Sequence, residues 1–319
     1  MKTKGISGST LKIIAIFAMV LDHIAWCLFE PVIRSDNIFG YSSNIYFNYH
    51  EAIPTLRVLS FAFHAVGRIT FPIMLFLMVE GLMHTRSKKK YIRNMLVFAL
   101  LSEVPFNLAL YLKPFMFTRV FPFIEINNIF FTLALGLIAV AVGERIMTAE
   151  SLPKIITILG FAGVPAFAIS TAYYTAFSIS ESTKVKFSCL LFCVLSAVFF
   201  VECVLLMRKK DKDKNARLSL FLAVVTSAAW ITMLFNSDYA FIGVVALFIM
   251  YMLKSKRTAS YFTGCAYLAA NNYFIGFSLL ALPLIHFYNG KRGMNLKYFF
   301  YAFYPLHLIV LWMIKAVVF

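Results

Sequence analysis

Apolar segments long enough to cross a membrane recur along the whole chain, separated by short stretches that hold most of the charges. A spanning helix needs about 20 predominantly apolar residues. The ninth and tenth of the predicted helices are the weakest, because each is short and Asn271-Asn272 separates them. Because apolar segments of spanning length recur along the chain, we expect an all-α polytopic membrane protein. The pattern predicts eleven spanning helices, at residues 11–29, 61–83, 94–112, 129–147, 155–177, 186–207, 217–235, 239–253, 258–270, 273–288 and 298–318.

Composition supports this fold class and excludes others. Of the 319 residues, 61% are hydrophobic and 14% are charged, and the mean hydropathy is +0.81. Soluble domains have about 25% charged residues, so a soluble enzyme, a disordered chain and a disulfide scaffold are excluded. The five cysteines lie in or beside apolar segments without a CxxC pair or metal-ligand spacing, and we expect no metal.

The distribution of charge indicates an orientation in the membrane. Lys and Arg total 30 against 14 Asp and Glu, and cytoplasmic loops are enriched in Lys and Arg. Most basic residues fall in inside loops if the N-terminus is cytoplasmic and the C-terminus external, so the positive charge indicates topology and we expect no nucleic-acid partner. Because Asp22-His23 interrupts the first apolar segment and no cleavage site follows, that segment is expected to be retained as a helix. Residues 30–60 and 113–128 are then long external segments.

Several ionisable and amide side chains lie within or at the ends of the apolar segments, where insertion costs about 2.5–3.5 kcal/mol for each charge. Their types suggest acid–base chemistry, with His23 as base, a carboxylate to orient it or bind an acceptor amine, and Arg68 to stabilise negative charge. Neighbouring helical residues point about 100° apart, so Asp22 and His23 cannot face one partner. The alternative is a polar network that holds helices together. The candidate catalytic residues are Asp22, His23, Arg68, Glu103, Asn127, Asn128, Asp238 and His307.

A second group of polar residues lies at the predicted inner ends of the helices. Glu80 and His84 are four residues apart on one helix face, a basic run follows, and the string YNGKRG (288–293) adds a second basic loop. These residues either anchor the chain at the membrane surface or bind phosphate groups. His50, His64 and His286 have no evident partners in the sequence. The candidate cofactor-binding residues are Glu80, His84, Arg86, Lys88, Lys89, Arg93, Asn289, Lys291 and Arg292.

An ordered set of short strings along most of the chain resembles the TraX family, whose best-known member acetylates the pilin of the F conjugation system. No single string is specific, and the resemblance depends on their order. The strings are Asp22-His23, GRITFP (67–72), Glu80-Gly81, His84-Thr85, Tyr91 with Arg93, SEVPF (102–106), NxxFxT as 127–132, Asp238-Tyr239, YNGKRG and FYPLH (303–307).

The resemblance implies acetyl or other acyl transfer from acyl-CoA to an acceptor at the membrane, by a protein of the bacterial cytoplasmic membrane. TraX-like proteins are also distantly similar to transmembrane acyltransferases that pass an acyl group from cytosolic acyl-CoA to extracytoplasmic sugars. Acetyl-CoA is the expected donor, and membrane lipid surrounds the chain. The acceptor is left open among a peptide N-terminus, a glycan and a lipid-linked sugar, because residues 148–235 carry few of the motifs. We expect one domain over 1–319, motif-rich at 1–147 and 236–319.

Two other classes share the features of the sequence. A secondary transporter or flippase also has many spans and intramembrane charges, although no internal repeat supports a repeat-built transporter. A structural subunit of an envelope machine would not need the buried charges. The ordered strings favour the acyltransferase.

Overall fold

The computed structural model describes residues 5–35, 52–110, 127–150, 212–270, 276–295 and 297–318. These residues form helices joined by short turns, and only two isolated β-bridges occur among them, Ile6 with Tyr288 and Asn127 with Ser237. The prediction of an all-α protein is therefore confirmed.

The first apolar segment forms one long helical run with a change of hydrogen bonding inside it. α1 (Gly8–Ile24) begins after Ser7, whose Oγ accepts a hydrogen bond from the Thr10 N–H at 3.2 Å. A π-helical turn, η1 (Ala25–Phe29), follows, and α2 (Glu30–Ser35) continues the run. Such turns insert one residue into a helix and are frequent at functional sites. The turn begins two residues after His23.

The second predicted span consists of two helices. α4 (Ile53–Gly67) and α5 (Thr70–His84) meet at a break over Arg68 and Ile69, and together they form an apolar run of 32 residues. α6 (Lys88–Leu110) follows after a short turn and contains Pro105.

The remaining described helices complete the element order. They are α7 (Ile129–Thr148), α10 (Lys212–Leu234), α11 (Ala240–Met252), α12 (Arg257–Ala270), the 3₁₀ turn η5 (Phe277–Leu280), α13 (Ala281–His286) and α14 (Lys297–Val318).

The predicted number of spans is matched only in part. Within the described ranges, five helical runs are long and apolar enough to cross a membrane, and three shorter apolar helices accompany them. The predicted spans 155–177 and 186–207 lie outside the described residues.

The expectation that residues 30–60 form an external segment is wrong at both ends, because helix continues to Ser35 and resumes at Ile53. The polar residues there pair between helices: Ser60 Oγ donates to Glu30 Oε1 at 2.9 Å.

The chain forms two compact units, Met1–Ala134 with Thr232–Phe319, and Leu135–Ile231. In the second unit, Gly143 of α7 packs against the ring of Phe221 of α10, and Arg217 donates to the carbonyls of Ile146 and Ala149.

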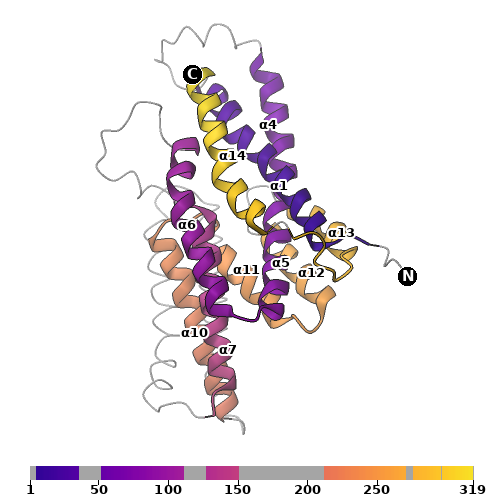
Figure 1. Cartoon of the computed structure of the whole chain (residues 1–319), viewed down its shortest axis with the longest axis vertical. Helices are drawn as coiled ribbons and strands as arrows, with labels where there is room; N and C mark the ends of the chain where they lie inside the picture. Colours follow the sequence, from indigo (N-terminus) through magenta and orange to yellow (C-terminus); the bar gives the residue numbers. More distant parts are fainter. Residues whose placement is uncertain are drawn as a thin grey trace. The chain divides into compact units, whose positions relative to one another are not determined.

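The first unit contains every candidate catalytic residue. In it α1 packs against α4, α5 and α14, and α14 packs against α6 (Figure 1). Small buried residues of α1, Ala15 and Ala18, allow close approach, and the rings of Phe98 (α6) and Tyr301 (α14) stack with centroids 4.3 Å apart. This packing brings α1, α4 and α14 together around residues 22, 23, 64, 68 and 307.

Candidate active site

His23 lies against His307 across the contact between α1 and α14. Nδ1 of His23 is 2.7 Å from Nε2 of His307, and the two rings are nearly parallel at 7° with centroids 5.0 Å apart. Tyr304, one turn before His307, packs edge-on against both imidazoles. Nδ1 of His307 lies 2.9 Å from the carbonyl oxygen of Phe303. Two histidines distant in sequence thus form one hydrogen-bonded pair.

Asp22 faces α4 instead. Its Oδ1 accepts a hydrogen bond from His64 Nδ1 at 2.8 Å and another from an Arg68 guanidinium nitrogen at 2.9 Å. His64 and Arg68 are four residues apart at the end of α4, so both reach the same carboxylate. A buried charge needs a partner, and Arg68 supplies one for Asp22.

The cluster extends from Asp22 along α4 to a second carboxylate. Nε2 of His64 lies 3.7 Å from Glu30 Oε1, which also accepts the hydrogen bond from Ser60. The indole of Trp26 packs edge-on against His64, with centroids 5.3 Å apart. His64 therefore lies between two carboxylates from the same helical run.

Arg68 also reaches the turn between α10 and α11. One guanidinium nitrogen is 3.4 Å from the Tyr239 hydroxyl oxygen, and the ring of Tyr239 stacks on Phe71. Asn236, Tyr239 and Ala240 have positive φ angles of 48°, 57° and 29°, which are uncommon for residues other than glycine. The turn is therefore strained where it presents Tyr239 to Arg68.

Asp238 lies in this strained turn, outside the helices. Its Oδ1 accepts from the Tyr239 N–H at 2.9 Å, and its carbonyl accepts from Thr132 Oγ1 at 2.6 Å. Burial raises the pKa of Asp238 to about 6, although the charge of Arg68 opposes the shift. The Asn127 backbone ties the same turn by accepting from the Asp238 N–H and donating to the Asn236 carbonyl.

Glu103 belongs to a separate buried network. It accepts from Asn107 Nδ2 at 2.8 Å and from both the backbone and the side-chain amide of Asn128, at 3.1 and 2.6 Å. Asn128 Nδ2 also donates to the Ala99 carbonyl at 2.7 Å. These contacts join α6 to the start of α7. The hydrogen bonds of Glu103 and Asn128 in the described structure do not reach the His23–His307 pair.

A cavity of about 140 Å³ lies inside the first unit between α1, α5, α6 and α14. It runs along α1 from Lys12 to Met19 and along α14 from Phe300 to Tyr304, and Tyr304 packs against His23 and His307. Its wall is mostly apolar and rich in methionine, a flexible side chain that adapts to irregular ligands. The cavity therefore extends from Lys12 to Tyr304, the residue whose ring packs against the histidine pair. The other lining residues are Ala15, Ile16, Thr70, Met74, Leu77, Met78, Tyr91, Met95, Phe130 and Tyr301.

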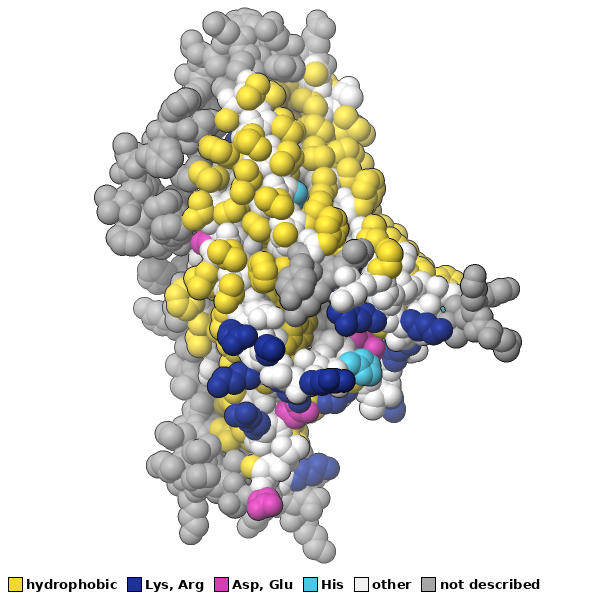
Figure 2. All heavy atoms as spheres, viewed as in Figure 1, with side chains coloured by type: hydrophobic (Ala, Val, Ile, Leu, Met, Phe, Trp, Pro, Cys, Tyr) yellow, Lys and Arg dark blue, Asp and Glu magenta, His cyan; other side chains and the backbone are white. Residues whose placement is uncertain are grey.

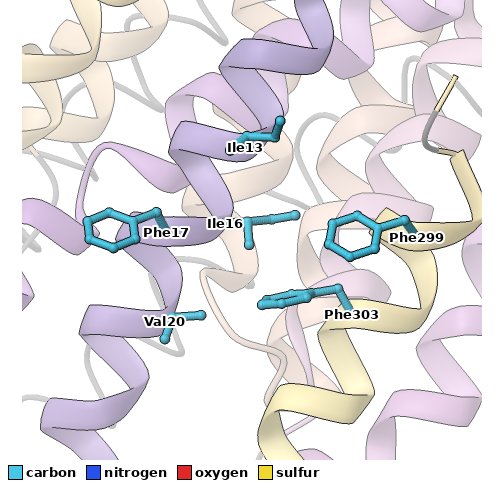
Figure 3. Close-up of a pocket in the computed structure, with 6 residues that line it drawn as sticks. All are labelled: Ile13, Ile16, Phe17, Val20, Phe299 and Phe303. Atoms are coloured by element: carbon cyan, nitrogen blue, oxygen red, sulfur yellow. The ribbon is translucent and has the colours of Figure 1, made fainter. Parts of the chain in front are cut away.

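A wholly apolar groove of about 420 Å³ lies on the opposite side of the α1–α14 contact. Figure 3 shows Ile16 and Val20 of α1 facing Phe299 and Phe303 of α14 across it, with Ile13 one turn before Ile16 and Phe17 on the side of α1 away from α14. Ile16 lines both spaces. The ring of Phe303 stacks on His307 with centroids 5.2 Å apart, so the groove ends beside the histidine pair.

The basic residues gather along one edge of the apolar surface, as Figure 2 shows. Arg86, Lys89, Arg93, Lys291 and Arg292 are exposed, and His84 Nε2 lies 3.7 Å from Glu80 Oε2.

The YNGKRG loop has a structural role as well. The Lys291 and Arg292 carbonyls accept from the first N–H groups of α1, at 2.8 and 2.9 Å, and the Asn289 side chain donates to the Gly5 carbonyl. The loop thus holds the start of α1 while its two basic side chains point outward. Among the residues that the structure describes, no group of three His, Cys, Asp or Glu side chains is placed to hold a metal.

Three residues that contact Asp22, His64 or Arg68 were not among the candidates predicted from the sequence: His64, Glu30 and Tyr239. The expectation that His64 has no partner is wrong, because its side chain forms a hydrogen bond with Asp22. Its spacing of four from Arg68 was the available signal. His286 also has a partner, the Tyr261 hydroxyl at 2.8 Å, and His50 lies outside the described residues.

Comparison with known proteins shows which family the chain resembles. The model of the family described as "TraX protein" matches residues 7–176 and 167–315. A "Probable fimbrial assembly protein FimC, serogroup H1" of Dichelobacter nodosus is 25% identical over 309 residues, which cover 96% of this chain and 94% of that protein. No solved structure matches the chain.

Proposed function

Because this chain belongs to the TraX family, we propose that it is a membrane acetyltransferase that moves an acetyl group from cytosolic acetyl-CoA to an amine or hydroxyl at the outer side of the membrane. The observation that carries the proposal is the His23–His307 pair, which packs against Tyr304 in the wall of a cavity that is also lined by Lys12. A general base must lie where both donor and acceptor can reach it. A donor arm in the cavity would bring a thioester to this pair.

In this proposal, acetyl-CoA binds where the basic residues gather along one edge of the apolar surface, here called the basic edge. The phosphates of CoA bind Arg86, Lys88, Lys89, Arg93, Lys291 and Arg292, since guanidinium and ammonium groups are the usual partners of phosphate. Glu80, His84 and Asn289 border this edge and orient its side chains. The pantetheine arm then passes between the helices along the methionine-rich wall. The cavity widens to admit the arm, as flexible methionine side chains permit.

His23 takes the proton of the acceptor, and the nucleophile attacks the thioester carbonyl. Arg68 and the Tyr239 hydroxyl are the donors proposed for the tetrahedral oxyanion. The carboxylate of Asp22 holds Arg68 in place through the 2.9 Å hydrogen bond. Glu103, Asn127, Asn128 and Asp238 support the surrounding backbone, and their role is to keep this arrangement rigid.

The acceptor proposed for the first test is a pilin-like subunit, because a relative is named a probable fimbrial assembly protein. Glycans and lipid-linked sugars are the acceptors to test next. The cluster of Trp26, Glu30, Ser60 and His64 extends away from His23 on the side opposite the basic edge along α1. It offers a polar path along which an external acceptor approaches.

Thermal shift of the detergent-purified protein with acetyl-CoA, CoA and ATP tests the donor. A ligand that prefers the folded state stabilises it, by about 2.7 kcal/mol at 100 times Kd. We expect stabilisation by CoA species and not by ATP, and transfer of radiolabelled acetyl groups to a pilin-like acceptor in vesicles. His23→Ala should bind acetyl-CoA and lose transfer, whereas His286→Ala, the control, should retain both. No shift at millimolar acetyl-CoA with well-folded protein would instead favour a transporter.

A further inference from the structure

Both ring nitrogens of His307 are engaged, and one of the two contacts fixes where its proton lies. Nδ1 is 2.9 Å from the Phe303 carbonyl oxygen. A carbonyl oxygen only accepts hydrogen bonds, so Nδ1 carries the hydrogen. In the neutral ring the lone pair then belongs to Nε2, the atom that faces His23.

This proton position dictates that of His23. Nε2 of His307 accepts, so Nδ1 of His23 donates across the 2.7 Å separation. In a neutral imidazole only one nitrogen carries hydrogen. The lone pair of His23 is therefore on Nε2, which points away from His307. Across the described part of the chain no hydrogen bond to this Nε2 is found, and His23 is partly exposed.

We infer that His307 is a positioning residue for His23: it holds His23 in the tautomer whose Nε2 is the free base. The inference rests on the proposed role of His23 in acetyl transfer. The start of the relay is a backbone carbonyl, which cannot change its protonation and so keeps the direction of both hydrogen bonds fixed.

The pair also gives the proton a place during the reaction. The acceptor's N–H or O–H proton moves to His23 Nε2 as its N or O forms a bond to the acetyl carbon. The Nδ1 proton can shift toward His307 Nε2, so two rings share one positive charge. When the carbon–sulfur bond breaks, the leaving thiolate takes the proton from His23 Nε2, and both rings return to the neutral tautomers. One acetyl group and one proton have then been exchanged between acceptor and CoA.

Two substitutions separate this role from packing. His307→Phe retains a flat ring between Phe303 and His23 but removes the acceptor nitrogen. His307→Gln places an amide oxygen within reach of His23 Nδ1 and restores an acceptor. We expect kcat to fall roughly 10²- to 10⁴-fold in His307→Phe, as for removal of a general base or its orienting partner, with KM for acetyl-CoA unchanged. His307→Gln should recover at least tenfold of that loss.

The direct readout is ¹⁵N NMR of the full-length protein in nanodiscs with ¹⁵N-labelled histidine, the His23 signals being assigned by their loss in His23→Asn. In wild type, the hydrogen of His23 should lie on Nδ1, and in His307→Phe it should move wholly or partly to Nε2. An unchanged tautomer in His307→Phe, or full kcat in that variant, would overturn the inference. Thermal melting checks that each variant is folded, and His307→Leu, which also removes the acceptor nitrogen, gives the same comparison if His307→Phe does not fold.

The NMR measurement needs no turnover and no acceptor. If wild type fails to transfer acetyl groups but shows the Nδ1–H tautomer, and His307→Phe loses it, the proposed function fails while the role of His307 stands. If transfer occurs and the tautomer is independent of His307, the reverse holds.

Discussion

Gly67 lies so close to Asp22 that a Cβ atom at residue 67 would be 2.5 Å from the Asp22 Cβ and 2.6 Å from its Oδ1. Atoms this close must move apart. The absent side chain at residue 67 is thus what lets α4 approach α1 closely enough for Arg68 to meet the Asp22 carboxylate.

Gly67→Ala should therefore impair both stability and transfer. Overpacking of a tight contact costs typically about 1–3 kcal/mol, and the displaced Asp22 would lose its bond to Arg68. We expect a lower melting temperature and a kcat reduced at least tenfold. Gly81→Ala is the control, because a Cβ there meets the Tyr91 side chain, whose nearest atom is the hydroxyl oxygen at 3.3 Å. Equal effects of the two substitutions would contradict the special role of the Gly67 contact.

A bulky residue in the cavity should weaken donor binding. Met74 lines the cavity, and Met74→Trp fills part of its 140 Å³. We expect KM for acetyl-CoA to rise at least tenfold and the thermal shift by acetyl-CoA to shrink. Met83→Trp changes a residue on the same helix that is 39% exposed and does not line the cavity, so it should behave as wild type. An unaltered KM in Met74→Trp would show that the donor takes another route.

Charge reversal at the basic edge should act on affinity and in a salt-dependent way. Lys89→Glu with Arg93→Glu should raise KM for acetyl-CoA more than it lowers kcat, since both side chains are exposed and distant from the transferred group. Exposed charges are screened at high ionic strength, so wild type and variant should converge as salt is added. Lys214→Glu, another exposed lysine in the second unit, is the control. If apparent affinity stays the same at low salt, these residues serve topology alone.

The raised pKa of Asp238 predicts a pH-dependent difference in stability. Its folded pKa of about 6 exceeds the ordinary value of 3.8, so the folded state binds the proton more tightly than the unfolded state. The stability that this group contributes is complete below about pH 4 and is lost as pH rises to about 6. The melting temperature of wild type relative to Asp238→Asn should therefore fall across this window. A difference that is flat or rises with pH would contradict the burial of this carboxylate.

The helices were largely predictable because apolar segments are recognised from their length and composition. The boundaries failed where polar residues pair within the membrane: Glu30 and Ser60 read as external positions, yet each satisfies the other between two helices. Hydropathy scores each residue alone and does not register a hydrogen bond formed between helices. The count of eleven spans is not confirmed for a different reason, since short helices packed in a protein need not match the thickness of a bilayer.

The candidate site was predictable in its residues and not in its pairings. The sequence placed Asp22, His23, Arg68 and His307 within apolar segments, where charge is costly. It also indicated that Asp22 and His23 face different neighbours. Which neighbours these are depends on the packing of α1 against α4 and α14, and His64 became visible only through its contact with Asp22. The position of a residue along an apolar segment follows from the sequence, whereas the identity of the neighbouring helices does not.

The π-helical turn Ala25–Phe29, in which the Glu30 N–H bonds the Ala25 carbonyl five residues earlier, amounts to one residue inserted into the first helix. Each residue advances a helix by about 100°. Loss of one residue from this turn would restore an ordinary α-helix, leave Asp22 and His23 facing their partners, and rotate Glu30 and everything beyond it away from Ser60. An insertion at residues 25–29, or a deletion there that spares Trp26, would thus change the angle between His23 and the outer polar path without altering a side chain of either.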